Sequence, residues 1–187
     1  MSFTRMDQGT VADWKTILAD SSPYDRDFPD RILAMLRALQ GLEGGFAVDQ
    51  LAHALQTASR AERAGANDEL VLAALCHDVG KAISLKNHAS IGAEILRPWV
   101  STDVYRILAT HQDFQGRYYY SFLKGDIDPS LRLRHRDEAW FSRAEQFCDE
   151  WDQVSFDPAY ESLPLSHFEP LVRRILGVKK APSIREP

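Results

Sequence analysis

Residues 70–76, LVLAALC, restrict the fold more than any other stretch, because they are apolar on nearly every side of a helix. Asn67 or Asp68 is expected to cap the start of this helix. A helix without a polar face has to be surrounded by other elements, so we expect it at the centre of the domain. It ends in two ionisable residues, His77 and Asp78, which it would carry toward the interior.

Helical spacing of apolar residues recurs along the rest of the chain, and no segment predicts a strand. Pro29 suits the first turn of one helix, and Gly65 suits the C-cap of another. Helices are expected at about 10–20, 29–40, 47–64, 67–76, 87–97, 101–111, 137–153 and 166–176. With 187 residues the chain is long enough to bury one core. The predicted fold class is therefore an all-α, single-domain helical bundle.

Composition excludes several classes of protein. The net charge of −5 argues against nucleic acid or an anionic membrane as a partner, although a small anionic substrate stays open. No apolar run approaches the roughly 18 residues that span a membrane, and residues 1–20 lack the apolar core of a signal peptide. Cys76 and Cys148 form neither a zinc motif nor a disulfide framework. A reducing cytoplasm is the expected location.

The positions of four histidines point to a metal site. His53 lies on a helix stripe, His77 ends the most buried helix, His88 lies in a first helical turn, and His111 is expected to end its helix. A lone histidine at such a place usually packs in the core or caps a helix. Burying four imidazoles with Asp78 is costly unless something binds them, and a metal ion gives each a partner. Asp78 could bridge to a second ion.

These residues resemble the HD-domain superfamily, helical metal-dependent enzymes named for the pair seen here as His77-Asp78. The order of histidines and aspartates resembles the subgroup with two metals and six protein ligands. The resemblance implies the following ligands: His53, His77, Asp78, His88, His111 and either Asp149 or Asp152. Asp152 is preferred because it follows Trp151, as in the family's Trp-Asp pattern. The implied organisation is an N-terminal helical extension at 1–45, an HD domain at 46–178 and a flexible tail at 179–187.

Two activities follow from this resemblance. The runs HALQTA at 53–58 and KNHASIGA at 86–93 look like the mixed-valent diiron oxygenases, a group that includes myo-inositol oxygenase and phosphonate-cleaving enzymes. This implies two iron ions (Fe2+/Fe3+), O2 and a small hydroxylated polar substrate. The alternative is a dinuclear phosphohydrolase that uses Mn2+, Mg2+ or another divalent metal on a nucleotide or phosphate ester. A third interpretation is a non-catalytic helical interaction module that keeps the ligands.

Asp78 and Lys81 are the expected catalytic residues. In the hydrolase, Asp78 would orient a metal-bound hydroxide and Lys81 would neutralise phosphate charge. In the oxygenases, the residue at the position of Lys81 contacts the substrate's oxygens; the phosphonate-cleaving enzymes tend to have His there, which weakens phosphonate as the substrate.

Residues 112–128 follow His111 and are a candidate substrate lid, although their tyrosines could equally pack the bundle. The expected substrate contacts are Lys81, Gln112, Arg117, Tyr118 and Lys124. The expected partners are a small-molecule substrate and O2, with no nucleic acid and no membrane, and the protein is expected to be a monomer or homodimer.

Overall fold

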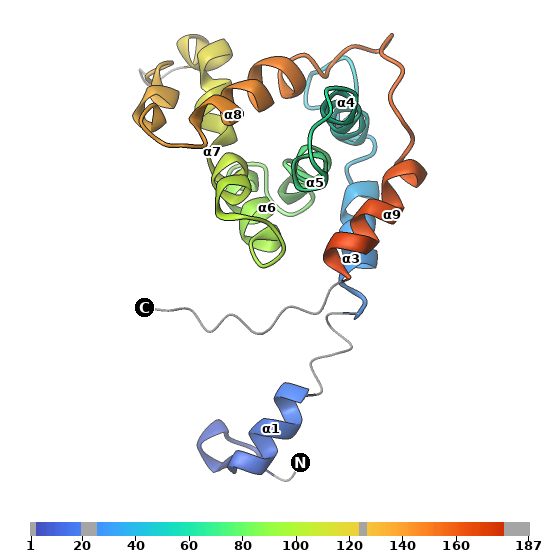
Figure 1. Cartoon of the computed structure of the whole chain (residues 1–187), viewed down its shortest axis with the longest axis vertical. Helices are drawn as coiled ribbons and strands as arrows, with labels where there is room; N and C mark the ends of the chain where they lie inside the picture. The colour runs from blue at the N-terminus through green and yellow to red at the C-terminus, as the bar shows by residue number, and fades with distance from the viewer. Residues whose placement is uncertain (1–2, 20–25, 124–126, 178–187) are drawn as a thin grey trace.

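The computed structural model describes residues 3–19, 26–123 and 127–177, and within these ranges the chain is helical and contains no strand. Figure 1 shows helices α3 to α9 gathered around α5, with α1 apart from them. The longer elements are α1 (Val11–Ala19), α3 (Phe28–Arg37), α4 (Gln50–Arg63), α5 (Asp68–Cys76), α6 (His88–Leu96), α7 (Thr102–Tyr119), α8 (Phe141–Gln146) and α9 (Leu165–Leu176). The predicted all-α fold class is confirmed.

Helix α5 is the central element, as its composition predicted. The side chain of Asn67 caps it by accepting a hydrogen bond from the backbone N–H of Leu70 at 3.0 Å. Every residue from Leu70 to Cys76 is buried. Helices α4, α7 and α9 pack against α5. This burial leaves His77, at the end of α5, inside the domain.

Helices α4, α6 and α7 surround one end of α5. Asp49 caps α4 by accepting from the N–H of Ala52 at 2.8 Å, and Ser101 caps α7 in the same way. Helices α6 and α7 pack along each other. The short 3-10 helix η2 (Val79–Ala82) turns the chain from α5 to α6 and packs against α6. Residues distant in sequence thus come together at the end of α5.

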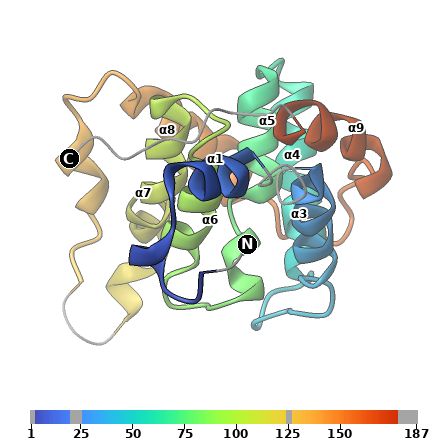
Figure 2. The same cartoon turned by 90° about the horizontal axis from the view of Figure 1, so that it is seen from below.

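Helices α3 and α9 pack side by side on the other flank of the bundle (Figure 1). Ile32, Leu33 and Leu36 of α3 are fully buried in the same core as α5. Residues 3–19 form the 3-10 helix η1 (Met6–Gln8) and α1, and they contribute no residue to this core. Figure 2 gives the view along the bundle from the side of α1. The boundary between 45 and 46 stays a prediction, and the expected tail at 179–187 lies outside the described residues.

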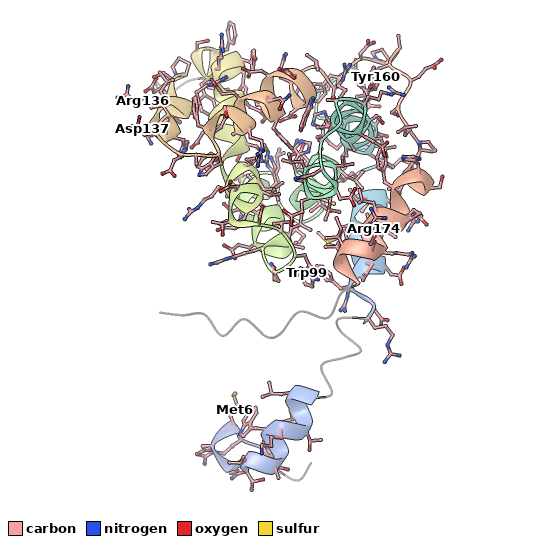
Figure 3. All side chains as sticks on the ribbon, in the orientation of Figure 1. Met6, Trp99, Arg136, Asp137, Tyr160 and Arg174 are labelled. Atoms are coloured by element: carbon pink, nitrogen blue, oxygen red, sulfur yellow. The ribbon has the colours of Figure 1, made fainter. Side chains whose placement is uncertain are left out.

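Two predicted helix limits were wrong. Asp137 does not begin a helix: it lies with Arg136 at the outer edge of the molecule (Figure 3), and its side chain is 92% exposed. The helix begins at Phe141 and continues as the π-helical segment η5 (Phe147–Asp152). Helix α7 runs on to Tyr119, so His111 lies within the helix and not at its end.

The 3-10 helix η4 (Leu131–His135) precedes α8, and its Arg132 is buried. Another 3-10 helix, η3 (Tyr120–Phe122), follows α7. Within the described residues, no helix combines the length and the apolar character needed to cross a bilayer.

Candidate metal centre

Six buried side chains from five elements meet at the end of α5. They form two groups, each with its ligand atoms within 4.8 Å of one another. The first group is His53, His77 and Asp152, and the second is Asp78, His88 and His111. These are the six residues predicted as metal ligands. The structure brings them together, and metal binding itself stays a prediction.

Each of the four imidazoles is held by a backbone carbonyl through its Nδ1 atom. The partners are Ser155 for His53 at 3.0 Å, Ala74 for His77 at 2.9 Å, Leu85 for His88 at 2.8 Å and Leu108 for His111 at 2.7 Å. A carbonyl oxygen only accepts hydrogen bonds, so each Nδ1 must carry the hydrogen. In the neutral ring, Nε2 is then left with a free lone pair, as in histidines that bind metals.

The free Nε2 atoms face one another inside each group. His53 Nε2 and His77 Nε2 are 3.0 Å apart, and His88 Nε2 and His111 Nε2 are 3.3 Å apart. Two lone pairs at such distances need a cation between or beside them, which is either a proton or a metal ion. The paired geometry therefore fits two metal ions, one for each group.

Asp78 reaches both groups with its two carboxylate oxygens. Its Oδ2 lies 3.3 Å from His77 Nε2 and 3.4 Å from His53 Nε2. Its Oδ1 lies 2.9 Å from His88 Nε2 and 3.6 Å from His111 Nε2. A carboxylate placed this way suits a bridge between two ions, which was the role expected of Asp78 from the sequence.

Asp152 completes the first group. Its Oδ1 lies 3.2 Å from His53 Nε2, and its Oδ2 accepts a hydrogen bond from Gln115 Nε2 at 2.7 Å. Asp149, the alternative ligand, points elsewhere and is paired with Arg132 at 2.9 Å.

Each group also contains one buried carboxylate oxygen without a hydrogen-bond partner, Asp78 Oδ1 in the second and Asp152 Oδ1 in the first. Such orphaned buried oxygens are costly without a ligand, so they support metal binding in both groups.

The charges of the centre depend on one another. Burial alone would raise the pKa of Asp78 and of Asp152, but His77 and its neighbours outweigh this and hold both pKa values well below the usual range. Burial would lower the pKa of His77, but the two carboxylates raise it to about 10. Burial lowers the pKa of His111. Without a metal, a proton on His77 thus offsets part of the negative charge, and metal binding would release it.

Lys81 lies at the edge of the centre. Its ammonium group donates to Asp78 Oδ2 at 2.5 Å and to Gln50 Oε1 at 2.7 Å. Because its side chain keeps 14% of its surface exposed, Lys81 can also meet a ligand from outside. Gly80 makes this turn possible, since a Cβ there would lie 2.2 Å from the backbone oxygen of His88.

A cavity of about 400 Å³ opens beside the centre. It is lined by Phe46, Lys81, Leu85, His88, Gln112, Gln115, Tyr118, Tyr119, Gln153 and Phe156. Three of the predicted substrate contacts, Lys81, Gln112 and Tyr118, are thus brought to one cavity. Arg117 is not part of its lining; it is largely exposed and lies 3.7 Å from Asp149. Lys124 lies outside the described residues. Residues 112–119 of the expected lid continue α7.

Several residues of the site were missed from the sequence. Gln115 follows His111 by four positions, so helical spacing alone was a signal that both face the centre. Gln50 precedes His53 by one turn and carried the same signal. Phe156 stacks on the ring of His53 at 4.1 Å and on Phe46 at 4.1 Å. No local pattern indicated that stack, because it joins the two ends of the domain.

The donor set is chemically suited to divalent metals of the first transition series, which imidazole and carboxylate ligands hold well. The model of the HD domain family matches residues 51–157, which include all six predicted ligands. No curated protein shows significant sequence similarity to the chain. Since the match covers more than half of the sequence, the chain belongs to the HD domain family, whose members are generally metal-dependent enzymes that bind divalent metals.

Proposed function

We propose that the protein is an oxygenase that uses two iron ions and O2 to oxidise or cleave a small, hydroxylated polar substrate. The cavity beside Asp78 and His88 is the observation that carries this proposal, because its volume of about 400 Å³ suits a small molecule. Iron held by the two ligand groups would supply the O2 chemistry. The proposed partners are thus the small-molecule substrate and O2. The enzyme itself is proposed to be a monomer or homodimer.

The chemistry of the cavity wall favours hydroxyl groups over a chain of phosphates. Among the described lining residues, Lys81 is the permanent cation, and Asp78 already balances its charge. Much of the remaining polar lining is uncharged, namely the amides of Gln112, Gln115 and Gln153 and the phenols of Tyr118 and Tyr119. Amides and phenols both donate and accept, so they match the hydroxyl groups of a polyol.

The residues of the wall have separate roles in this proposal. Lys81 donates a hydrogen bond to a substrate oxygen beside Asp78 and so orients the substrate at the centre. Gln112 and Tyr118 fix its other polar groups. Phe46, Leu85 and Phe156 cover the apolar side and exclude water from the reacting atoms.

The test is O2 consumption by protein loaded with Fe2+ without air and then exposed to O2 with a panel of cyclic and linear polyols and hydroxyalkylphosphonates. An active substrate should raise O2 uptake above the background rate and perturb the EPR signal of a mixed-valent iron pair. His88→Ala, which removes a ligand of the second group, is the control and should show neither effect. Protein that holds only zinc or manganese and shows no such signal would exclude the oxygenase.

The second candidate is a dinuclear phosphohydrolase. The ion pair between Lys81 and Asp78 supports it, because a cation beside a bridging carboxylate suits a phosphoryl group. In this case Mn2+- or Mg2+-loaded protein should release phosphate from a nucleotide or phosphate ester without O2. Release of phosphate with no O2 uptake on any polyol would favour this candidate over the oxygenase.

A further inference from the structure

Gln115 connects the cavity to the first ligand group. It lies on α7 one turn after His111, and its side chain lines the cavity. Its Nε2 donates to Asp152 Oδ2 at 2.7 Å. Asp152 Oδ1, the other oxygen of the same carboxylate, is buried, has no hydrogen bond and lies 3.2 Å from His53 Nε2. Gln115 therefore fixes one oxygen of Asp152 while the other faces the first group.

We propose that Gln115 is a positioning residue for the metal of the first group, acting through Asp152. A carboxylate that is fixed at one oxygen cannot rotate freely, so the other oxygen stays aimed at the ion. The four imidazoles are oriented by backbone carbonyls, whereas Asp152 is oriented by a side chain. Removal of such an outer partner typically weakens metal binding by about 10–100-fold.

The position of Gln115 on α7 separates the loss of its amide from a general disturbance of the helix. His111 and Gln115 lie on the same helix, but His111 belongs to the second group, whereas the Gln115 amide donates to Asp152 of the first. A general disturbance of α7 would weaken both metals. Loss of the Gln115 amide alone should weaken one metal and leave the other unchanged.

The experiment is a titration with Co2+, followed by its visible absorption, in two backgrounds that keep one group each. His88→Ala disrupts the second group and His53→Ala disrupts the first. Gln115→Met should weaken Co2+ binding by about 10–100-fold in the His88→Ala background and by less than about twofold in the His53→Ala background. In the protein with both groups intact, Gln115→Met should weaken the binding of one of the two Co2+ ions and leave the other unchanged.

Gln112→Met is the matched control, because Gln112 lines the same cavity from the same helix and, among the described residues, forms no hydrogen bond with a metal ligand. It should leave Co2+ affinity unchanged in both backgrounds. Gln115→Leu, with a different shape and the same loss of the amide, should repeat the effect of Gln115→Met. The thermal midpoint of the metal-free variants should match that of the unaltered metal-free protein.

Equal weakening in both backgrounds, or a lowered metal-free midpoint, would assign Gln115 a purely structural role and overturn the proposal. Unchanged Co2+ affinity in the His88→Ala background would overturn it as well. The titration uses neither O2 nor a substrate, so its result is independent of whether the protein is an oxygenase.

Discussion

The Nε2 atoms of His53 and His77 lie 3.0 Å apart, while the Nδ1 atom of each ring donates to a backbone carbonyl. The carbonyls fix which nitrogen carries the hydrogen, and so they fix which lone pairs face inward. The same arrangement recurs for His88 and His111. The main chain thus sets the direction of the lone pairs that would bind the metals.

Removal of metal should lower the stability of the protein. A ligand present at 100 times its dissociation constant stabilises the folded state by about 2.7 kcal/mol. For a chain of this size, that corresponds to a fall in thermal midpoint of roughly 5–10 °C when a chelator is added. Calorimetry with and without chelator measures the difference. His77→Ala should show a clearly smaller difference, and an equal one would mean that the metal binds elsewhere.

Asp78→Ala should reduce the binding of both metals, because Asp78 Oδ1 faces the second group and Asp78 Oδ2 faces the first. His88→Ala should reduce only one, because His88 belongs to a single group. Elemental analysis after dialysis against a fixed concentration of metal gives the number of ions per chain. Equal losses in the two variants would argue against a bridge.

Lys81→Met should retain both metals and lose activity. The ammonium group of Lys81 competes with a metal ion for Asp78 Oδ2, so its removal should leave metal affinity unchanged or raise it several-fold. Turnover should fall, because the substrate loses its cationic partner in the cavity. Metal content and turnover are measured on the same sample. A Lys81→Met protein that lost its metals would show that Lys81 supports the centre and not the substrate.

Gly80→Ala should destabilise the fold by about 1–3 kcal/mol or more, because the added Cβ would meet the backbone oxygen of His88 at 2.2 Å. Urea unfolding measures the loss. Gly92→Ala is the control with a milder contact, since its Cβ would lie 3.2 Å from the nearest atom, the backbone oxygen of His77. It should lower the urea midpoint less than Gly80→Ala does. A Gly80→Ala protein that unfolds at the urea midpoint of the unaltered protein would show that the turn between α5 and α6 has room for a side chain.

The ion pair between Arg132 and Asp149 should make stability depend on acid pH. Burial raises the pKa of Asp149, but hydrogen bonds from Arg132 and Tyr118 outweigh this and lower the pKa. The contribution of a carboxylate with a lowered pKa is present above its ordinary pKa of about 4 and is lost as the pH falls through its folded value. Asp149→Asn should cost about 1–3 kcal/mol at pH 7 and progressively less below pH 4.

Urea unfolding of the metal-free protein between pH 7 and pH 3 tests this pH dependence. Asp137→Asn is the control, because Asp137 is 92% exposed and should change stability little at any pH. A constant difference between Asp149→Asn and the unaltered protein across this range would contradict the prediction.

Much of the centre followed from the sequence because its signals are local. The apolar run before His77 and the cap at Asn67 define α5, and helical spacing then sets the face of each ligand. Spacing alone did not separate Asp149 from Asp152, since both lie in η5. The resemblance favoured Asp152, and the structure distinguishes the two by their partners, Arg132 for Asp149 and Gln115 for Asp152.

The start of α8 was wrong for a related reason. Asp137 is a good helix-capping residue in sequence, but the chain makes turns after η4, where Arg132 is buried against Asp149. The stacking of Phe156 on His53 likewise joins distant segments. Tertiary contacts of this kind leave no periodic signal in the sequence.

The four carbonyl contacts differ in their reach along the chain. His77, His88 and His111 each use a carbonyl three residues earlier, whereas His53 uses Ser155, which is 102 positions away. Local structure, namely the end of α5, the turn before α6 and a turn of α7, therefore presets three imidazoles. The fourth is set only when the two ends of the domain have met. A metal ion in the first group would then act as a reversible cross-link that closes a long loop of chain. Its contribution to folding would follow the free metal concentration in the surroundings.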